Sequence, residues 1–130
     1  LQISDFVFHN LKNFESGKED SVLVFDKNLS KLAQNWITNI IDCHYLGCCI
    51  AFKKELLRTF LPFPYKLTGH DYWISSLALR YFKVSYIPEP LIYHRRYIGA
   101  VSYKKKNSFL FKIKYRLVLF FQILFRKESI

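Results

Sequence analysis

The segment that decides how the rest of the chain is organised is His70-Asp71-Tyr72-Trp73-Ile74-Ser75-Ser76-Leu77-Ala78-Leu79-Arg80-Tyr81. Its apolar residues recur at positions 73, 74, 77, 78 and 81, which is the spacing of a helix that buries one face. Asp71 falls in the first turn of this predicted helix. Because strand-like segments flank the helix on both sides, the sequence predicts an α/β fold in which helices cover a sheet.

Upstream of this helix, the sequence predicts a strand followed by another helix. Residues 45–52 are mostly small and apolar and include Gly47, which is typical of a strand that another group approaches closely. Residues 53–60 follow helical spacing. Pro62 and Pro64 end this second helix because proline has no N–H to donate.

Downstream of the central helix, the sequence predicts two extended runs. Residues 84–87 have the composition of a short strand, and residues 91–97 form a second extended run. Pro88 and Pro90 lie between the two runs and predict a bend that separates them.

The N-terminal region is predicted to contain strands, a loop and a helix. Residues 1–8 indicate a buried strand, and residues 10–20, rich in Lys, Glu and Asn, indicate a solvated loop. Residues 22–25 indicate a short strand, and residues 28–41 place apolar side chains at helical spacing. The whole pattern predicts a mixed sheet with flanking helices.

The C-terminal residues 104–130 are predicted to form a separate basic tail with an amphipathic helix at residues 107–127. At about 100° per residue, one side of this helix collects most of the polar residues. Two apolar residues, Leu119 and Ile123, also lie on that polar side, and one charged residue, Lys114, lies on the apolar side. The polar side holds Lys112, Arg116, Gln122, Arg126 and Lys127, and the apolar side holds Leu110, Phe111, Ile113, Leu117, Val118, Phe121, Leu124 and Phe125.

Composition describes a packed domain whose charge is distributed unevenly. The chain has 130 residues, 51% of them hydrophobic, which is enough for one domain with a core. Its net charge of +10 comes from the C-terminal end, because residues 94–130 carry 10 Lys or Arg and 1 Asp or Glu. Residues 1–93 carry 10 and 9 respectively. Since the excess is confined to the tail and no nucleic-acid-binding motif occurs, we expect no nucleic-acid partner.

Two further features concern the origin of the chain. It contains no Met and begins inside a predicted strand, so we expect it to be a fragment. Cys43, Cys48 and Cys49 are odd in number and show no C-x-x-C spacing, which argues against a disulfide framework and a zinc site. We therefore expect a reducing compartment, the cytoplasm.

Four motifs follow one another between residues 47 and 93, within a stretch of similarity that spans roughly residues 4–102. They are Gly47-Cys48-Cys49-Ile50-Ala51-Phe52, Leu61-Pro62-Phe63-Pro64, His70-Asp71-Tyr72-Trp73 and Glu89-Pro90-Leu91-Ile92-Tyr93. In this order they resemble the C-terminal half of family 2 glycosyltransferases. The likeness is greatest to bacterial rhamnosyltransferase-like members that build surface polysaccharides.

The resemblance implies the C-terminal part of a GT-A fold. Residues 1–103 would be its acceptor-binding and base-bearing half. In such enzymes an N-terminal half binds the nucleotide-sugar donor through a divalent metal, Mg²⁺ or Mn²⁺, held by an Asp-x-Asp motif. This chain has no Asp-x-Asp, so we expect the donor half and the metal site to lie upstream of Leu1.

Asp71 is the residue to which the resemblance assigns catalysis. An inverting transfer needs a carboxylate that takes the proton of an acceptor hydroxyl while that oxygen attacks the anomeric carbon. The dipole of a helix keeps a carboxylate in the first turn ionised. Family members have His-Asp-Trp-Trp here, so this chain departs only at Tyr72. The alternative, which is compatible with catalysis, is that Thr68 and Asp71 form an ordinary capping box.

The resemblance assigns Gly47, Cys48, His70, Tyr72 and Trp73 to the acceptor side. Gly47 would allow the sugar to approach the backbone closely. Ordinary packing is the alternative for the cysteine and the aromatic residues, because small apolar and aromatic side chains at such positions usually belong to a core.

Arg95 and Arg96 match two arginines of a Tyr-Arg-Arg-His segment in relatives, with Tyr97 in place of the histidine. We assign both to the donor phosphates, because guanidinium groups suit diphosphate oxygens. The alternative is a solvated basic strand end. Because the histidine is missing, we assign no metal ligand from this segment.

The sequence therefore predicts part of an inverting glycosyltransferase that transfers a sugar to a hydroxyl of a glycan or lipid-linked acceptor, and that is inactive without its donor half. The alternative function is a membrane-surface binding module acting through residues 104–127, where Lys104, Lys105 and Lys106 precede the helix. That helix could instead pack against the missing half or a second subunit. We expect a cytoplasmic protein, peripheral on the inner face of the plasma membrane.

Overall fold

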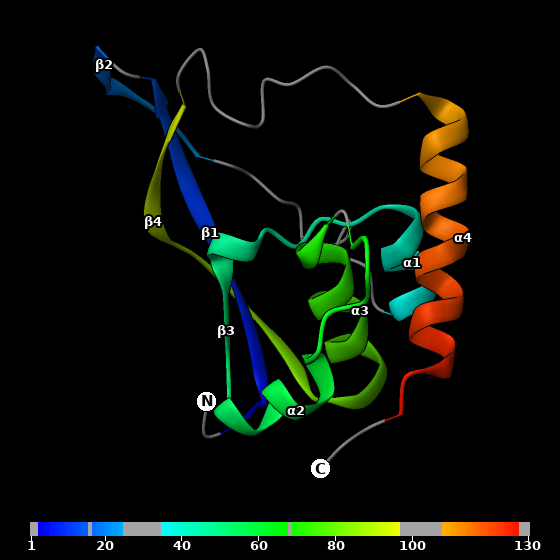
Figure 1. The fold of residues 1–130 in the computed structure, drawn as a ribbon. Helices are drawn as coiled ribbons and strands as arrows, with labels where there is room; N and C mark the ends of the chain where they lie inside the picture. Colours follow the sequence, from blue (N-terminus) through cyan, green and yellow to red (C-terminus); the bar gives the residue numbers. More distant parts are fainter. Residues whose placement is uncertain (1–2, 16, 25–34, 68, 97–107, 128–130) are drawn as a thin grey trace.

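Strands and helices alternate along most of the chain (Figure 1). The structure, a computed structural model, describes residues 3–15, 17–24, 35–67, 69–96 and 108–127, with the backbone only for 18–24. The α/β class predicted from the sequence is confirmed. In order, the elements are β1 (Phe6–Glu15), β2 (Lys18–Val24), α1 (Trp36–Ile41), β3 (Ile50–Phe52), α2 (Leu57–Phe60), α3 (His70–Tyr81), β4 (Val84–Arg96) and α4 (Phe109–Phe125).

The sheet is mixed, as predicted, and β1 is the strand on which it is built. On one side, β1 pairs in parallel with β4. On its other side, it pairs antiparallel with β3 near its start and with β2 near its end, which makes four strands in the described residues. Phe6 thus lies between Val84 of β4 and Phe52 of β3. Phe6 is fully buried, which indicates that the strands and helices around it are closely packed.

The predicted break between two extended runs at Pro88 and Pro90 is wrong, because β4 is one strand. The register with β1 shifts at this point, where His9 faces Ile87 but Asn10 faces Pro90. Proline cannot donate to a sheet ladder, so extra residues bulge out of the pairing instead of ending it. The buried Asn10 side chain accepts a hydrogen bond from the Leu11 N–H (2.9 Å) at this irregularity.

The predicted loop at residues 10–20 is also wrong. β1 continues to Glu15, and β2 returns antiparallel from Lys18. Gly17 lies in the turn with φ 82°, a conformation that glycine adopts without strain. This end of the sheet extends beyond the helices (Figure 1), so its strands carry polar residues that resemble a loop in the sequence.

Two further predicted elements differ in detail. The predicted strand at 45–52 is a 3₁₀ turn, Gly47–Cys49, followed by the short β3. The helix predicted at 28–41 corresponds to α1, which Asn35 caps by accepting a hydrogen bond from the Thr38 N–H (3.0 Å). Residues 28–34 lie outside the described part of the chain. The predicted helix at 53–60 is a 3₁₀ turn, Lys54–Leu56, that runs into α2.

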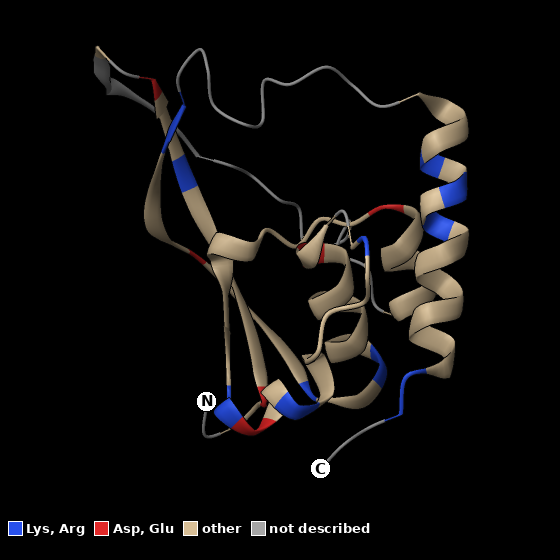
Figure 2. Ribbon diagram, viewed as in Figure 1, with Lys and Arg blue, Asp and Glu red and all other residues tan. Residues whose placement is uncertain are grey.

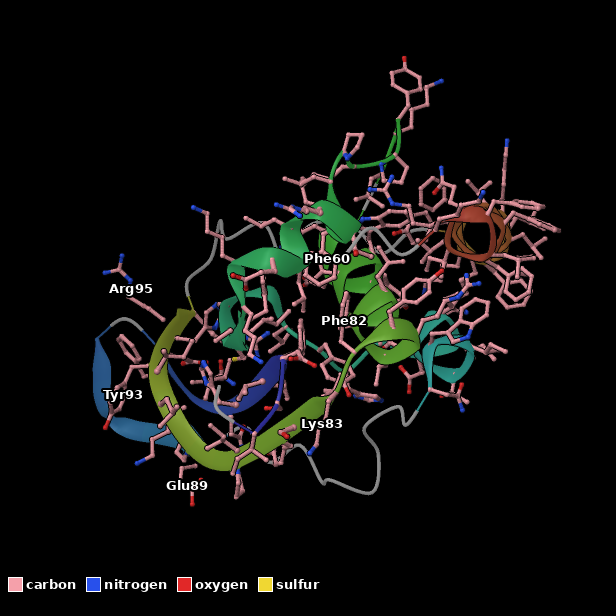
Figure 3. All side chains as sticks on the ribbon, turned by 90° about the horizontal axis from the view of Figure 1, so that it is seen from below. Phe60, Phe82, Lys83, Glu89, Tyr93 and Arg95 are labelled. Atoms are coloured by element: carbon pink, nitrogen blue, oxygen red, sulfur yellow. The ribbon has the colours of Figure 1, made fainter. Side chains whose placement is uncertain are left out.

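The core lies between the sheet and α3, whose predicted range of residues 70–81 is confirmed. Trp73 is 1% exposed, and its indole N–H donates to the Phe60 carbonyl (2.8 Å) at the end of α2. Phe82 packs edge-on against Phe60, and Figure 3 shows both rings pointing into the interior. The buried apolar residues of the sheet and its neighbouring turns are Phe6, Phe8, Leu11, Tyr45, Cys49, Leu56 and Phe60.

Helix α4 forms an outer layer beyond α1 and α3 (Figure 1). At its C-terminal end, the Arg126 guanidinium donates to the carbonyls of Thr59 (2.9 Å), in the last turn of α2, and of Leu61, which follows that helix. The same guanidinium lies 5.9 Å from the Trp73 ring centroid. A cation thus satisfies carbonyls that a helix end leaves without partners.

Further contacts join α3 and α1 to α4. The Arg80 guanidinium donates to the Ile123 carbonyl and stacks over the Trp36 ring, which itself stacks on Phe120 (5.3 Å). The Tyr81 hydroxyl donates to the carbonyl at position 126. The contacts are concentrated in the C-terminal half of α4.

Asp5 joins three strands at the start of the sheet. Its carboxylate accepts hydrogen bonds from the Lys53 ammonium (2.8 Å) and from the Lys83 backbone N–H (3.3 Å). Its backbone bonds to both of the same residues. The hydrogen bond from Lys53, followed by that from Lys83, lowers the pKa of Asp5 below its ordinary value.

We predict that Arg126→Ala destabilises the chain by about 1.5–3 kcal/mol, which is the range for hydrogen bonds made by a charged group. Urea unfolding followed by circular dichroism measures the change. The matched control is Lys127→Ala, because Lys127 is the exposed next residue. We expect this control to change stability by less than about 0.5 kcal/mol. Equal effects of the two substitutions would contradict the anchoring role of Arg126.

We predict that Asp5→Asn lowers the urea midpoint at neutral pH. A carboxylate with a lowered folded-state pKa contributes stability above its unfolded-state pKa of about 3.9, and this stability is lost as the pH falls through the folded value. The midpoints of the variant and the unmodified chain should therefore converge on acidification below about pH 4. Glu55→Gln, at an exposed carboxylate nearby, is the control. A difference that persists unchanged at low pH would contradict the assignment.

Candidate functional site

Asp71 lies in the first turn of α3, as predicted, and the fold places this turn beside the 3₁₀ turn that precedes β3. Helix α3 leads directly into β4 and runs opposite to it (Figure 1). The start of α3 therefore lies level with the middle of β1 and β4, and the carboxyl ends of both strands extend beyond it (Figure 1).

Asp71 and His70 form a pair at the start of α3. His70 Nε2 lies 2.7 Å from Asp71 Oδ1. Oδ1 is buried and has no well-aligned hydrogen bond among the described residues, so the short approach is an electrostatic contact. The side chains of His70 and Asp71 are 65% and 31% exposed, respectively. The exposed part of Asp71 therefore lies on atoms other than Oδ1.

Gly47 lies against this pair. A Cβ at position 47 would overlap Asp71 Oδ1 and would lie 2.6 Å from His70 Nε2. Glycine is therefore required for this arrangement because of space, since the 3₁₀ turn at Gly47 has no positive φ. The structure thus brings together two motifs that are separated by more than twenty positions in the sequence.

Buried polar groups support the first turn of α3 from below. Ser75 Oγ donates to the Asp71 backbone carbonyl, and the Asn39 amide of α1 donates to Ser75 Oγ and Ser76 Oγ (2.8 Å each). All three side chains are fully buried. Because buried polar groups are costly to leave unpaired, this cluster fixes α1 against α3. The sequence did not predict this polar cluster, although Ser75 and Ser76 interrupt the run of apolar residues in α3.

Helix α4 also reaches the start of α3, which sequence reasoning did not predict. The Tyr115 hydroxyl donates to the Gly69 carbonyl (3.4 Å), and its ring packs edge-on against Tyr72 (6.0 Å). Burial raises the pKa of Tyr115 to about 12, so the phenol remains protonated at neutral pH and can donate. The spacing of Tyr115 and Leu119, four residues apart, is the signal that could have placed both on one helix face.

The capping-box alternative for Asp71 does not match the observed helix start. The N-cap is Gly69, which has no side chain to accept a hydrogen bond, and Thr68 lies outside the described residues. Asp71 still lies where the helix dipole favours a negative charge.

The other predicted acceptor residues occupy different environments. Cys48 is exposed next to Gly47, whereas Cys49 is buried. The alternative of ordinary packing in the core therefore fits Cys49 and not Cys48. Tyr72 is half-buried against Tyr115. Trp73 is core, and in this structure its ring is not accessible to a sugar.

Arg95 and Arg96 are not brought to Asp71. Both are exposed at the end of β4, opposite Phe14 and Glu15 of β1. Figure 1 shows this end of the sheet extending away from the start of α3, and Figure 3 shows Arg95 pointing outward at the rim. Tyr97 lies outside the described residues.

Comparison with known proteins leaves the family open. No protein-family model matches the chain, and neither the curated proteins nor the solved structures include a significant match. Within the described ranges, no three His, Cys, Asp or Glu side chains come together in a way that could hold a metal ion.

We predict that Gly47→Ala displaces the His70 ring and the Asp71 carboxylate, because the new Cβ would occupy their space. Both displaced groups are side-chain ends, so we expect a loss of stability of only about 1 kcal/mol. The measurement is the NMR chemical shifts of the His70 imidazole together with the urea midpoint. Cys48→Ala, at the exposed neighbour, should leave the imidazole shifts unchanged. Unaltered His70 shifts in Gly47→Ala would show that the close approach is absent in solution.

Proposed function

We propose that this chain carries the acceptor-binding and base-bearing half of an inverting glycosyltransferase, with Asp71 as the base. The observation that carries the proposal is the contact of Gly47 with the Asp71 and His70 side chains. Three residues that the sequence resemblance assigns to the acceptor side and the base are thus neighbours. A hydroxyl held on the surface beside Gly47 would therefore lie close to the Asp71 carboxylate, as general-base catalysis requires.

In the proposed reaction, an acceptor hydroxyl lies beside the accessible part of the Asp71 carboxylate. The hydroxyl oxygen attacks the anomeric carbon of the donor sugar and forms the new glycosidic bond. The bond from that carbon to the diphosphate breaks on the opposite face, and the electron pair leaves with the nucleoside diphosphate. Asp71 accepts the hydroxyl proton, for which we assign Oδ2, because Oδ1 is buried against His70.

The neighbouring residues have positioning roles in this proposal. His70 contacts Oδ1 and thereby orients the carboxylate. The glycine at 47 and the exposed Cys48 form the surface on which the acceptor approaches. We leave Trp73 out of the acceptor site because it is buried, and we leave Arg95 out because it lies at the far end of β4.

The proposal requires a donor half that these residues do not contain. We infer that β1 to β4 belong to the C-terminal part of a GT-A fold, and that a preceding half holds the nucleotide sugar and a divalent metal through Asp-x-Asp. The acceptor would be a glycan or a lipid-linked sugar, as in the surface-polysaccharide enzymes that the motifs resemble. We place the reaction on the cytoplasmic side of the membrane, where nucleotide sugars are made.

A purely structural role for Asp71 makes a different prediction. A carboxylate in the first turn of a helix contributes about 0.3–1 kcal/mol of stability through the helix dipole, whatever the protein does. Under that role, replacing Asp71 would change stability slightly and leave any transferase activity intact.

We predict that Asp71→Asn in the full-length protein lowers turnover by about 10²–10⁴-fold, the range for loss of a general base. The assay follows release of nucleoside diphosphate from dTDP-rhamnose, UDP-glucose and UDP-galactose in the presence of membrane extract as the acceptor source. The KM for the donor should change little, because Asp71 acts on the acceptor proton.

The matched control for this experiment is Asp42→Asn. Asp42 also lies 2.7 Å from a histidine, His44, but on the exposed loop after α1. We expect normal turnover from this variant. Normal turnover of a folded Asp71→Asn variant would rule out Asp71 as the base.

A further inference from the structure

Helix α4 presents a broad apolar face away from the protein. The exposed residues recur at intervals of three and four along its whole length, from Leu110 (78% exposed) to Phe125 (76%). The helix has 17 residues, so this face is about 25 Å long. Its large exposed side chains are Phe109, Leu110, Phe111, Ile113, Leu117, Val118, Phe121, Leu124 and Phe125.

The face that α4 packs on the protein is the one predicted to be polar. Leu119 and Ile123, the two exceptions on that side, are its fully buried residues. Arg116 is half-buried there, and Arg126 donates to carbonyls at the end of α2. The domain therefore uses the mixed side of the helix for docking and leaves the more apolar side uncovered.

The charge around the uncovered face has one sign. Residues 109–127 contain five Lys or Arg and no Asp or Glu. Figure 2 shows basic residues on the N-terminal half of α4 and no acidic ones along it. Lys112 and Lys114 are exposed toward one end of the helix, and Lys127 is exposed just beyond the other. A partner for this surface must accept apolar side chains and bear negative charge.

We propose that this face of α4 docks on an anionic lipid bilayer, with the helix lying in the plane of the interface. Interfacial helices insert an apolar face to the depth of the acyl boundary, while lysines at the rim meet anionic headgroups. A face that is straight, rich in Phe and Leu, and exposed along its full length fits a flat surface. No helix in the described part of the chain is long and apolar enough to cross a membrane. The inference does not rest on the proposed transferase activity.

A second copy of the chain is a poorer match for this face. Each copy carries a net charge of +10, and pairing two α4 helices would bring lysines of the same sign together. Apolar contact alone would favour such a dimer, but the charge opposes it. An anionic bilayer satisfies both properties of the surface.

The experiment is co-sedimentation of the 130-residue chain with vesicles of phosphatidylcholine alone or with one part phosphatidylglycerol to three parts phosphatidylcholine. We expect strong partition into the anionic vesicles and several-fold weaker partition into the neutral ones. Leu117→Glu should lower partition into the anionic vesicles by about tenfold, because a leucine leaves the apolar phase and a negative charge replaces it.

The matched control is Leu91→Glu. Leu91 is 58% exposed and Leu117 is 55% exposed, but Leu91 lies on β4, on the sheet side of the molecule (Figure 1). We expect Leu91→Glu to bind like the unmodified chain, and circular dichroism checks that both variants are folded. A second variant, Lys112→Glu with Lys114→Glu, should reduce binding to anionic vesicles and leave the weak binding to neutral vesicles unchanged.

Three outcomes would overturn the proposal. One is that the chain binds neither kind of vesicle. Another is that Leu117→Glu and Leu91→Glu bind equally. The third is that sedimentation velocity shows a dimer that Leu117→Glu dissociates, because a second copy would then cover this face. Because no readout depends on sugar transfer, loss of the transferase proposal would leave these results unaffected.

Discussion

The parallel pairing of β1 with β4 is the constraint on which the rest of the structure depends. Parallel strands cannot be joined by a tight turn, so the chain must cross from one end of the sheet to the other before it enters β4. Helix α3 completes this crossover and is held on the sheet by Trp73, whose indole N–H bonds to the end of α2. Because α3 runs opposite to β4, its first turn, which carries Asp71, lies away from the start of β4 and level with the middle of the strand (Figure 1).

The candidate site follows from this topology together with a local requirement for space. The 3₁₀ turn before β3 lies against the start of α3, and only glycine at position 47 lets the two segments approach this closely. The polar cluster of Asn39, Ser75 and Ser76 holds α3 from the other side. A short acidic side chain is thus fixed in position while part of it stays exposed, and our proposal of Asp71 as a general base rests on this arrangement.

Helix α4 connects the two proposals through its docking. Its inner side supplies Tyr115 to the start of α3, and Arg126 just after the helix contacts the end of α2, so the helix packs on the described domain. Its outer side carries no contact with the described domain that would cover the apolar residues. An arrangement of this kind would hold the site near a membrane surface, where a lipid-linked acceptor would be located.

The sequence by itself determined the features that depend on local spacing: the α/β class, the bounds of α3, and the position of Asp71 in its first turn. It did not reveal the continuation of β1 past Asn10 or the unbroken course of β4 through Pro88. Both features depend on hydrogen bonds between strands that are far apart in the sequence, and polar residues in a paired strand resemble those of a loop. Only the tertiary structure brought Gly47 to Asp71 and decided which side of α4 is buried. Periodicity shows that a helix has two unlike faces, but the surface available beside it decides which one packs. Here the packed side buries Leu119 and Ile123 and brings Arg126 to the carbonyls at the end of α2.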